Sequence, residues 1–333
     1  MPHPSKNTPV ALAIGTHTWV PTPEDEVRQD EILAVLRKHH INVLDTARSY
    51  GNGASETALG NKKLAQEFKV YTKAATGVIE GTGKKDLILN FANESLKALQ
   101  VDKIPLYLLH APDETVPVNE QMDAIQTLYK EGKFVAFGLS NFSKDQVLEY
   151  HAYAKANGYV LPTVYQGSYS IAVRGNETAL FPTLRELGFS IQAYSPMAAG
   201  LLAKTPEYIE QGKGSWDPST PLGQVLRDLY YKPSYMKMLE QFGKLAEGLN
   251  ISRSSLSHRW LRYHSGLDGS LGDELLIGAV TAEQLEETLL ELEKGPLESW
   301  VVERIDGLWD LIKADAPIGN LESIRKVFRP LLS

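Results

Sequence analysis

Short apolar runs that alternate with amphipathic segments are the feature that most constrains the fold of this chain. The runs recur at intervals of about 30 residues and are rich in aliphatic and β-branched side chains, as strands buried on both faces require. Eight runs are expected to be strands: Val10–Ile14, Val43–Asp45, Phe68–Lys73, Ile104–Leu109, Phe134–Leu139, Thr163–Gln166, Ser190–Ala193 and Leu275–Ile277. This alternation predicts a parallel sheet, and eight strands favour a closed (β/α)8 barrel, the TIM barrel of the α/β class, over an open doubly wound sheet.

The segments between the runs carry apolar residues at helical spacing. Helices are expected at Asp25–His39, Lys85–Leu99, Val118–Glu131, Ser143–Ala156, Glu177–Leu187, Tyr235–Gly248, Ser252–His264, Thr281–Leu292 and Leu297–Ile312. Barrels of this kind use a whole chain of 333 residues as one unit, so residues 1–333 are predicted to form a single domain.

The connection between the seventh and eighth runs is much longer than the others. About 80 residues separate Ala193 from Leu275, and they include the Gly-, Ser- and Pro-bearing piece Gly212–Pro218. So long a loop in a compact domain is usually a lid or a binding loop, so we expect residues 197–235 to cover the site. After an extra C-terminal helix, residues 313–333 are predicted to form a tail that covers one end of the barrel.

Three of the apolar runs end in one ionisable residue each: Asp45, Lys73 and His110. In a parallel barrel the C-terminal ends of all strands open on the same face, so these residues can converge although they are far apart in sequence. Tyr50 lies in the polar loop just after Asp45. The sequence therefore predicts that Tyr50 is the centre of a site.

Convergence would give each of these residues a chemical role. A phenol has a pKa of about 10, too high for an efficient proton donor near neutrality, and a nearby ammonium such as Lys73 lowers it. Asp45 is the natural counter-ion of a buried ammonium, and a neutral His110 can orient the oxygen that Tyr50 protonates. Taken singly, each residue can instead be a cap, an ion-pair partner or a metal ligand. No second histidine lies at ligand spacing with His110, so no metal site is expected.

The turn Gly51-Asn52-Gly53 follows Tyr50. It is not the Gly-x-Gly-x-x-Gly sequence of a Rossmann unit, so it is a weak signal for a dinucleotide. Ser55 is expected to cap a helix that begins near Glu56.

Several motifs, in one order along the chain, resemble those of the aldo-keto reductase superfamily. They are Asp45-Thr46-Ala47, Tyr50-Gly51, Ser55-Glu56, Thr72-Lys73, Leu109-His110 with Pro112-Asp113, Phe137–Phe142, Pro162–Gly167 and Ala193–Pro196. Two later stretches, Leu180–Arg185 and Glu283–Glu286, most resemble the aflatoxin-aldehyde and succinic-semialdehyde reductase branch. The resemblance implies NADPH-dependent reduction of an aldehyde or ketone, with a catalytic tetrad made of Asp45, Tyr50, Lys73 and His110. The rival interpretation is a non-catalytic barrel that senses a dinucleotide and regulates a partner protein.

The resemblance also implies a site for NADP(H), with NAD(H) left open. Ser140, Asn141 and Gln166 match the positions that hold the carboxamide, and Tyr194 matches the one that stacks on the nicotinamide ring. The other cofactor positions follow the seventh and eighth strands: Ser195, Pro196, Gly200, Leu201 and Lys204, then Gly278, Ala279, Thr281, Gln284 and Glu287. This last stretch departs from the family because it contains no Lys or Arg and has Thr288 in place of an asparagine, so Lys204 or Arg259 would have to neutralise a 2′-phosphate.

Three segments are expected to form the substrate pocket. They carry His17, Trp19, Arg48, Trp216, Arg227, Leu229, Tyr230 and Tyr231. Leu229 stands where the succinic-semialdehyde branch has an arginine that binds the substrate carboxylate, although Arg227 lies close by in sequence. This mostly aromatic and apolar set predicts a preference for aromatic or bulky aldehydes over succinic semialdehyde, unless Arg227 supplies the missing charge.

Composition limits the other classes of function. The chain is 43% hydrophobic and 23% charged, as in ordinary globular proteins, and its net charge of −7 argues against a general binder of nucleic acid or anionic membranes. It has no cysteine, which excludes disulfides and thiolate catalysis. Met1–Pro9 does not resemble a secretory signal, and no apolar run approaches the roughly 20 residues of a membrane span, so a cytoplasmic location is expected. The expected partner is a small carbonyl compound, and a homodimer is left open.

Overall fold

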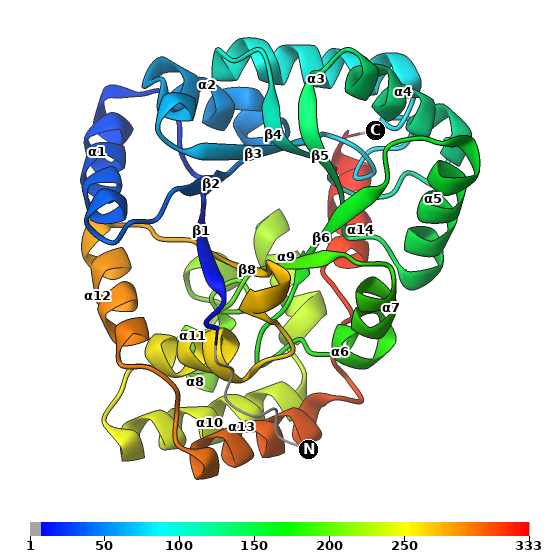
Figure 1. Ribbon diagram of the computed structural model, residues 1–333. Helices are drawn as coiled ribbons and strands as arrows, with labels where there is room; N and C mark the ends of the chain where they lie inside the picture. The colour runs from blue at the N-terminus through cyan, green and yellow to red at the C-terminus, as the bar shows by residue number, and fades with distance from the viewer. Residues whose placement is uncertain (1–7, 333) are drawn as a thin grey trace.

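Eight parallel strands close into a barrel in the computed structural model, which describes residues 8–332 (Figure 1). Each strand pairs with the next, and β8 pairs with β1 to complete the ring. The strands are β1 (Ala11–Gly15), β2 (Val43–Asp45), β3 (Lys69–Ala74), β4 (Ile104–Leu109), β5 (Phe134–Ser140), β6 (Pro162–Ser168), β7 (Ser190–Tyr194) and β8 (Glu274–Ile277). The predicted (β/α)8 barrel is confirmed.

Helices surround the barrel (Figure 1). Before β7 they are α1 (Pro23–Lys38), α2 (Ala54–Asn61), α3 (Lys85–Leu99), α4 (Val118–Lys130), α5 (Lys144–Asn157), α6 (Asn176–Ala179) and α7 (Phe181–Glu186). After β7 they are α8 (Pro206–Glu210), α9 (Pro221–Tyr230), α10 (Pro233–Leu249), α11 (Arg253–His264), α12 (Ala282–Glu293), α13 (Ser299–Ile312) and α14 (Leu321–Leu332). Short 3-10 turns are η1 (Tyr50–Gly53), η2 (Leu64–Gln66), η3 (Leu201–Ala203), η4 (Gly214–Trp216) and η5 (Gly269–Leu271). Within residues 8–332, no helix has the length and apolar character that crossing a bilayer requires.

Helix ends follow the capping chemistry of the sequence. α5 begins with a capping box, in which Ser143 Oγ accepts from the Gln146 backbone N–H while the Gln146 side chain accepts from the Ser143 N–H. The same helix ends at Gly158, whose φ of 64° a glycine adopts without strain. α1 is capped by Thr22 and carries acidic residues in its first turn and basic residues in its last, which complements the helix dipole.

Most predicted bounds agree with the structure to within one or two residues, and those of β2, β4 and α3 agree fully. The single helix predicted at Glu177–Leu187 is wrong. It is interrupted at Leu180, whose φ of −129° is not helical, and restarts as α7 with Pro182 in its first turn. Proline fits a first turn but not a helix interior, because it has no N–H to donate.

The predicted cap at Ser55 is also wrong. α2 begins at Ala54, directly after Gly53, so Ser55 lies inside the helix. Its hydroxyl donates to the Thr16 carbonyl (2.8 Å) and accepts from Thr46 Oγ1 (2.8 Å). Ser55 therefore ties the loops after β1 and β2 together beneath the turn that carries Tyr50.

The long connection between β7 and β8 belongs largely to the outer helical layer. α10 packs against α13, and α11 packs against α12. Its earlier part includes α8, η4 and α9. Of these, α9 packs against the C-terminal helix α14, which lies at the C-terminal end of the barrel. The role of residues 197–235 as a lid stays a prediction.

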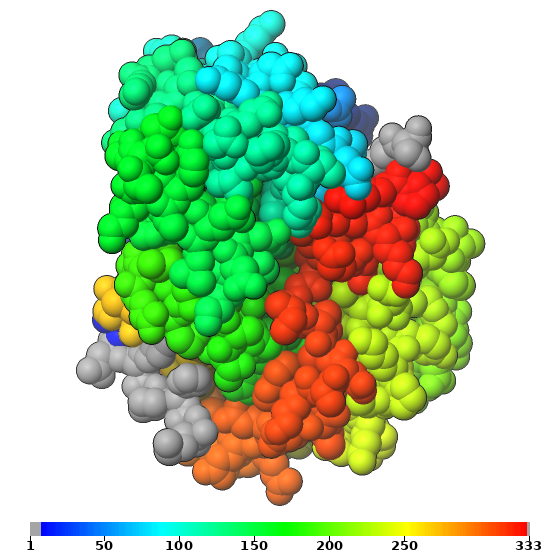
Figure 2. Space-filling model, turned by 90° about the vertical axis from the view of Figure 1, so that its right-hand side faces the viewer, coloured from blue at the N-terminus to red at the C-terminus, as the bar shows by residue number. Residues whose placement is uncertain are grey.

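The C-terminal tail is a helix rather than an irregular cover. α14 lies between the cyan segments around α3 and α4 and the yellow-green segments that include α9 and α10 (Figure 2). Arg325 of α14 donates to the Gly77 carbonyl (2.9 Å) and pairs with Glu114 (3.0 Å), both in loops that follow strand ends. The tail therefore lies at the C-terminal end of the barrel, and its end helix holds two of the loops there.

Candidate active site

Lys73, Asp45, Tyr50 and His110 meet at the C-terminal end of the barrel. Lys73 Nζ lies 2.6 Å from Asp45 Oδ1 and donates to the Thr46 carbonyl (2.7 Å), with Lys73 and Asp45 only 0% and 2% exposed. The same Nζ is 5.2 Å from the centroid of the Tyr50 ring. The rings of Tyr50 and His110 meet edge to face with centroids 5.6 Å apart. The predicted convergence is confirmed, and the catalytic roles stay predictions.

A sharp turn holds Tyr50 in place. Gly51 and Asn52 have φ angles of 56° and 52°, and Gly53 has a φ of 89°. A Cβ atom on Gly53 would also lie 1.9 Å from Arg48 Nη1. Both the backbone conformation and the close approach of the guanidinium therefore require glycine at position 53.

Arg48 supports this turn from outside the site. The sequence predicts Arg48 in the substrate wall, but its guanidinium pairs with Glu56 (2.9 Å) and Glu94 (3.0 Å) instead. Glu56 is fully buried and also accepts from Thr72 Oγ1 (2.6 Å). A buried carboxylate is costly without a counter-ion, so Arg48 stabilises the start of α2 rather than a substrate.

Burial and charge act in opposite directions on Lys73 and Tyr50. Burial lowers the pKa of Lys73, but Asp45 and Tyr50 together raise it by more than burial lowers it. The pKa of Lys73 is therefore above its ordinary value, and the group stays an ammonium. Burial raises the pKa of Tyr50 by more than the Lys73 charge lowers it. The expected effect of Lys73 has the right sign, but the expected net direction for Tyr50 is wrong, because covering the phenol outweighs the neighbouring charge.

His110 is neutral, as expected. Burial, followed by the positive charge of Lys73, lowers the pKa of His110 to about 3. Ser49 Oγ lies 3.1 Å from His110 Nδ1, which fixes the ring and leaves Nε2 for another partner. Ser49 could not be identified from the sequence, because a serine in a polar loop is common.

The His110 imidazole is expected not to titrate between pH 8 and pH 5. Its lowered pKa means that the folded protein binds no proton there, whereas the unfolded chain binds one below about 6.5. Stability is therefore lost as the pH falls from about 6.5 toward 3, and His110→Gln should move acid unfolding to lower pH. NMR of the histidine ring signals, assigned with His110→Gln, measures this directly. A midpoint near 6.5 would contradict the expected burial.

The residues assigned to the nicotinamide lie on neighbouring strand ends. Ser140 and Gln166 are register partners on β5 and β6, and Tyr194 ends β7. Asn141 donates to Ser140 Oγ (3.1 Å) and accepts from Tyr194 Oη (2.6 Å). Amide and hydroxyl groups in this arrangement fit a carboxamide, which offers one acceptor and two donors. Gln166 differs from the expectation in one respect, because its Nε2 already donates to Asp45 Oδ2 (3.0 Å).

The loop after β7 allows a ligand to approach its backbone closely. Four of its residues have positive φ angles, with Ser195 at 56°, Ala198 at 48°, Ala199 at 54° and Gly200 at 88°. The Pro196 carbonyl accepts from Ser257 Oγ (2.8 Å), which fixes the loop to α11. Lys204 follows η3 and places Nζ 4.4 Å from the centroid of the Tyr208 ring. The loop therefore fits the expected run along a pyrophosphate and ends in a positive charge.

The loop after β8 lacks basic residues of its own but has one beside it. Thr281 caps α12 by accepting from the Gln284 backbone N–H (3.3 Å). Arg28 of α1 donates to the Val280 carbonyl (3.1 Å), a contact between distant segments that the sequence did not reveal. Arg259, the expected alternative source of charge, donates instead to the carbonyls of residues 295 and 296 (2.9 and 3.0 Å).

Four of the eight residues predicted to line the substrate pocket are in the hydrophobic core instead. The exposed fractions are 1% for Trp19, 1% for Trp216, 3% for Leu229 and 2% for Tyr230. Leu229 and Tyr230 lie on the buried face of α9, which argues against their predicted place in the substrate wall.

The other predicted pocket residues remain accessible. Arg227 donates to the Ile209 carbonyl (3.1 Å), and its guanidinium lies 3.9 Å from the centroid of the half-exposed Tyr231 ring. His17, another predicted wall residue, contacts Tyr50, since the two ring centroids are 6.1 Å apart. Its pKa is lowered, first by burial and then by Arg28.

Comparison with known proteins gives this site a family. The profile of the Aldo/keto reductase family matches residues 11–310. The chain belongs to that family. The protein Oxidoreductase sirO of Leptosphaeria maculans is 44% identical over 291 residues, which cover 87% of this chain and 88% of the relative. Aflatoxin B1 aldehyde reductase member 4 of Homo sapiens is 36% identical over 321 residues, 92% of this chain and 94% of the relative. These identities confirm the resemblance to the aflatoxin-aldehyde branch. The protein is an oxidoreductase of the aldo/keto reductase family.

In this aldo/keto reductase, the C-terminal segment also reaches the site. Tyr194 Oη lies 2.7 Å from Asn320 Oδ1, just before α14. A cavity of about 310 Å³ opens beside Asn141, between the loops after β5 and β6 and residues 318–322, and its lining includes Phe142, Tyr165 and Leu180. Nothing in the sequence around Asn320 marks it as a site residue. Among residues 8–332, no group of three or more His, Asp or Glu side chains is placed to hold a metal ion.

Proposed function

We propose that this protein reduces an aldehyde or ketone to an alcohol with NADPH, and that Tyr50 donates the proton. The observation that carries the proposal is the Lys73 ammonium, which contacts Asp45 on one side and faces the Tyr50 ring on the other. The family supports the reaction class, and the printed names of the relatives, which include aldehyde reductases, support an aldehyde as substrate.

Each residue of the site has a task in this reaction. When bound, a reduced nicotinamide supplies the hydride that adds to the carbonyl carbon. Tyr50 Oη gives its proton to the carbonyl oxygen, so that the C=O group becomes CH–OH. Lys73 stabilises the phenolate left on Tyr50, and neutral His110 orients the carbonyl oxygen through Nε2.

NADPH is proposed as the preferred cofactor because cations are available near both loops assigned to it. Lys204 lies at the end of the loop after β7, and Arg28, which also pairs with Asp25, reaches the loop after β8. Either charge can pair with a 2′-phosphate, which carries negative charge at neutral pH. The ratio of kcat/KM for NADPH and NADH, measured for wild type, Lys204→Met and Arg28→Met, shows which cation acts.

The proposed substrate is an apolar, uncharged aldehyde. The related branch has a carboxylate-binding arginine at the position of Leu229, and Arg227 of α9 lies two residues away. Arg227 instead contacts the Ile209 carbonyl and the Tyr231 ring. Phe142, Tyr165 and Leu180 form an apolar part of the cavity beside Asn141, whose lining also includes the charged residues Lys144 and Glu322. At about 25 cal/mol per Å², an aromatic aldehyde that buries about 100 Å² more than a small one gains about 2.5 kcal/mol.

A kinetic panel of aldehydes tests both the reaction and the substrate class. NADPH oxidation is followed with 4-nitrobenzaldehyde, butyraldehyde and succinic semialdehyde, in wild type and in Arg227→Ala. We expect kcat/KM to be highest for the aromatic aldehyde and Arg227→Ala to leave the order unchanged. Preference for succinic semialdehyde that disappears in Arg227→Ala would overturn the substrate class. Tight NADPH binding without turnover of any carbonyl would favour the dinucleotide-sensing alternative over the proposed reaction.

A further inference from the structure

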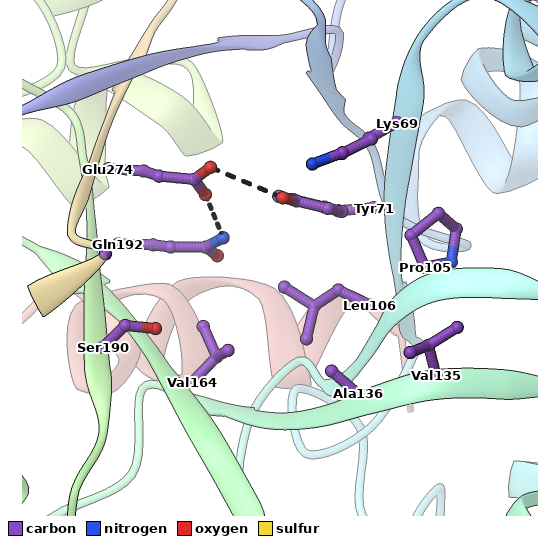
Figure 3. A pocket seen from close by; sticks show the side chains of 11 residues that line it. Lys69, Tyr71, Pro105, Leu106, Val135, Ala136, Val164, Ser190, Gln192 and Glu274 are labelled. Carbon is purple, nitrogen blue, oxygen red and sulfur yellow. Dashed lines mark hydrogen bonds between the residues drawn. The ribbon is translucent and has the colours of Figure 1, made fainter.

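A second cavity lies at the opposite end of the barrel from Tyr50. It has a volume of about 320 Å³ and is lined by residues near the N-terminal ends of the strands, among them Lys69, Tyr71 and Ser190 (Figure 3). Glu274, the first residue of β8, accepts hydrogen bonds there from Tyr71 Oη (3.4 Å) and Gln192 Nε2 (2.6 Å). A carboxylate in this position is unusual, because the interior of such barrels is normally packed with branched apolar side chains.

A chain of hydrogen bonds connects Glu274 to the ion pair at the other end. Gln192 Oε1 accepts from Gln166 Nε2 (2.9 Å), and the same Nε2 donates to Asp45 Oδ2 (3.0 Å). Asp45 in turn binds Lys73 through its other oxygen (2.6 Å). Gln166, Gln192 and Glu274 are register partners on β6, β7 and β8, so neighbouring strands fix their spacing.

The direction of this chain is set by its two carboxylates. An ionised carboxylate only accepts, so Gln192 must turn its NH₂ group toward Glu274 and its carbonyl oxygen toward Gln166. Gln166 then donates one N–H of its amide to Gln192 Oε1 and the other to Asp45 Oδ2. Its own carbonyl oxygen is left as an acceptor. Both glutamines are 2% exposed, so solvent offers them few other partners.

We propose that Glu274 is a positioning residue for the Asp45–Lys73 ion pair, acting through the aligned amides of Gln192 and Gln166. The inference rests on the proposed function, since Lys73 matters to catalysis only if Tyr50 is the proton donor. By fixing both amides, Glu274 holds one donor on Asp45 Oδ2 and so keeps Oδ1 turned to Lys73. Nothing in the family resemblance assigns a role to Glu274 or Gln192.

The surroundings of Glu274 make this alignment sensitive to pH. Burial raises the pKa of Glu274, Asp45 raises it further, and Gln192, Tyr71 and Lys69 partly offset the rise. Once protonated, the carboxyl group can donate as well as accept, so it no longer forces one orientation on Gln192. The positioning effect is therefore expected to weaken on the acid side of neutrality.

The test compares Glu274→Gln, Gln192→Leu and the double variant, with Ser190→Ala as a matched control in the same cavity. We expect each single variant to lower kcat for aldehyde reduction about tenfold without changing KM, and the double variant to be no worse than either, because both act through one chain. Ser190→Ala should match wild type. In wild type, kcat should fall as the pH drops and Glu274 becomes protonated. Glu274→Gln cannot be protonated in this way, so its kcat should fall less over the same pH range. Losses that multiply in the double variant, or an unchanged kcat and pH profile in Glu274→Gln, would overturn the proposal.

A second measurement needs no turnover. In protein labelled with ¹³C at tyrosine Cζ, the Tyr50 signal, assigned with Tyr50→Phe, should change equally in Glu274→Gln, in Gln192→Leu and in the double variant, and not in Ser190→Ala. Circular dichroism melts confirm that all four variants fold. An unmoved Tyr50 signal in folded variants would refute the positioning role. A moved signal in a protein that reduces no aldehyde would refute the proposed reaction and leave the positioning role standing.

Discussion

Tyr50→Phe is expected to lower kcat for aldehyde reduction by about 100-fold to 10,000-fold, the usual worth of a positioned general acid. The phenyl ring keeps the shape of the phenol and its edge-to-face contact with His110, so the change removes little except the proton. Steady-state NADPH oxidation at saturating aldehyde measures the loss.

Dinucleotide binding provides the control for this variant. The affinity for NADPH should stay within about twofold of wild type, because cofactor binding does not depend on the proton that Tyr50 transfers. Quenching of tryptophan fluorescence measures this affinity. Turnover at the wild-type rate would exclude Tyr50 as the donor. A parallel loss of NADPH affinity would show that the hydroxyl group serves binding rather than chemistry.

Lys73→Met is expected to lower kcat by about 100-fold or more and to shift the pH dependence of the reverse reaction, alcohol oxidation, because removing a general acid–base partner costs rate on this scale. Oxidation requires Tyr50 as phenolate, and the Lys73 charge lowers the pKa of Tyr50. Without that charge the pKa of Tyr50 rises, so the acid limb of the oxidation profile should move to higher pH. An unchanged profile together with an unchanged rate would mean that Lys73 serves only the fold.

Lys73→Met should also destabilise the protein by about 3–5 kcal/mol, because it leaves the buried Asp45 carboxylate without its counter-ion. Chemical denaturation measures this cost. The double variant Asp45→Asn/Lys73→Met removes both charges and should recover most of the stability without recovering activity. If activity returns together with stability, the loss in the single variant reflects folding alone.

The barrel and the convergence of Asp45, Lys73 and His110 around Tyr50 could be predicted because both depend on local patterns. A strand buried on both faces is largely apolar, so β4 and the residues of β2 before Asp45 are recognisable as apolar runs in the sequence. The first charged or polar residue after such a run must lie at the C-terminal end of its strand, where Tyr50 and His110 also lie.

The substrate wall was not predictable from the position of residues along the chain alone. Matching Leu229 to the arginine of the related branch does not say which face of α9 is buried. The helical spacing of Val225, Leu226, Leu229 and Tyr230 indicates a core-facing stripe, and the structure shows these four residues as buried. In α9 the helical spacing of apolar residues therefore indicates which side chains are buried.

The interior polar chain escaped prediction for a different reason. Gln192 interrupts an apolar run and Glu274 precedes one, where polar residues ordinarily face water. Only the register between β6, β7 and β8 turns both into the barrel and brings them into line with Gln166. Register between strands is a tertiary property, and it is not encoded in the neighbourhood of either residue.

The anchoring of α14 has a consequence for biosynthesis. Arg325 binds the carbonyl of Gly77 and pairs with Glu114, and Asn320 contacts Tyr194, so α14 and the residue before it complete the rim of the site. All eight strands precede these residues in the chain, and a growing chain emerges from the ribosome with its N-terminal part first, at about 5–20 residues per second. A nascent chain that has exposed only the eight strands therefore lacks this part of the rim.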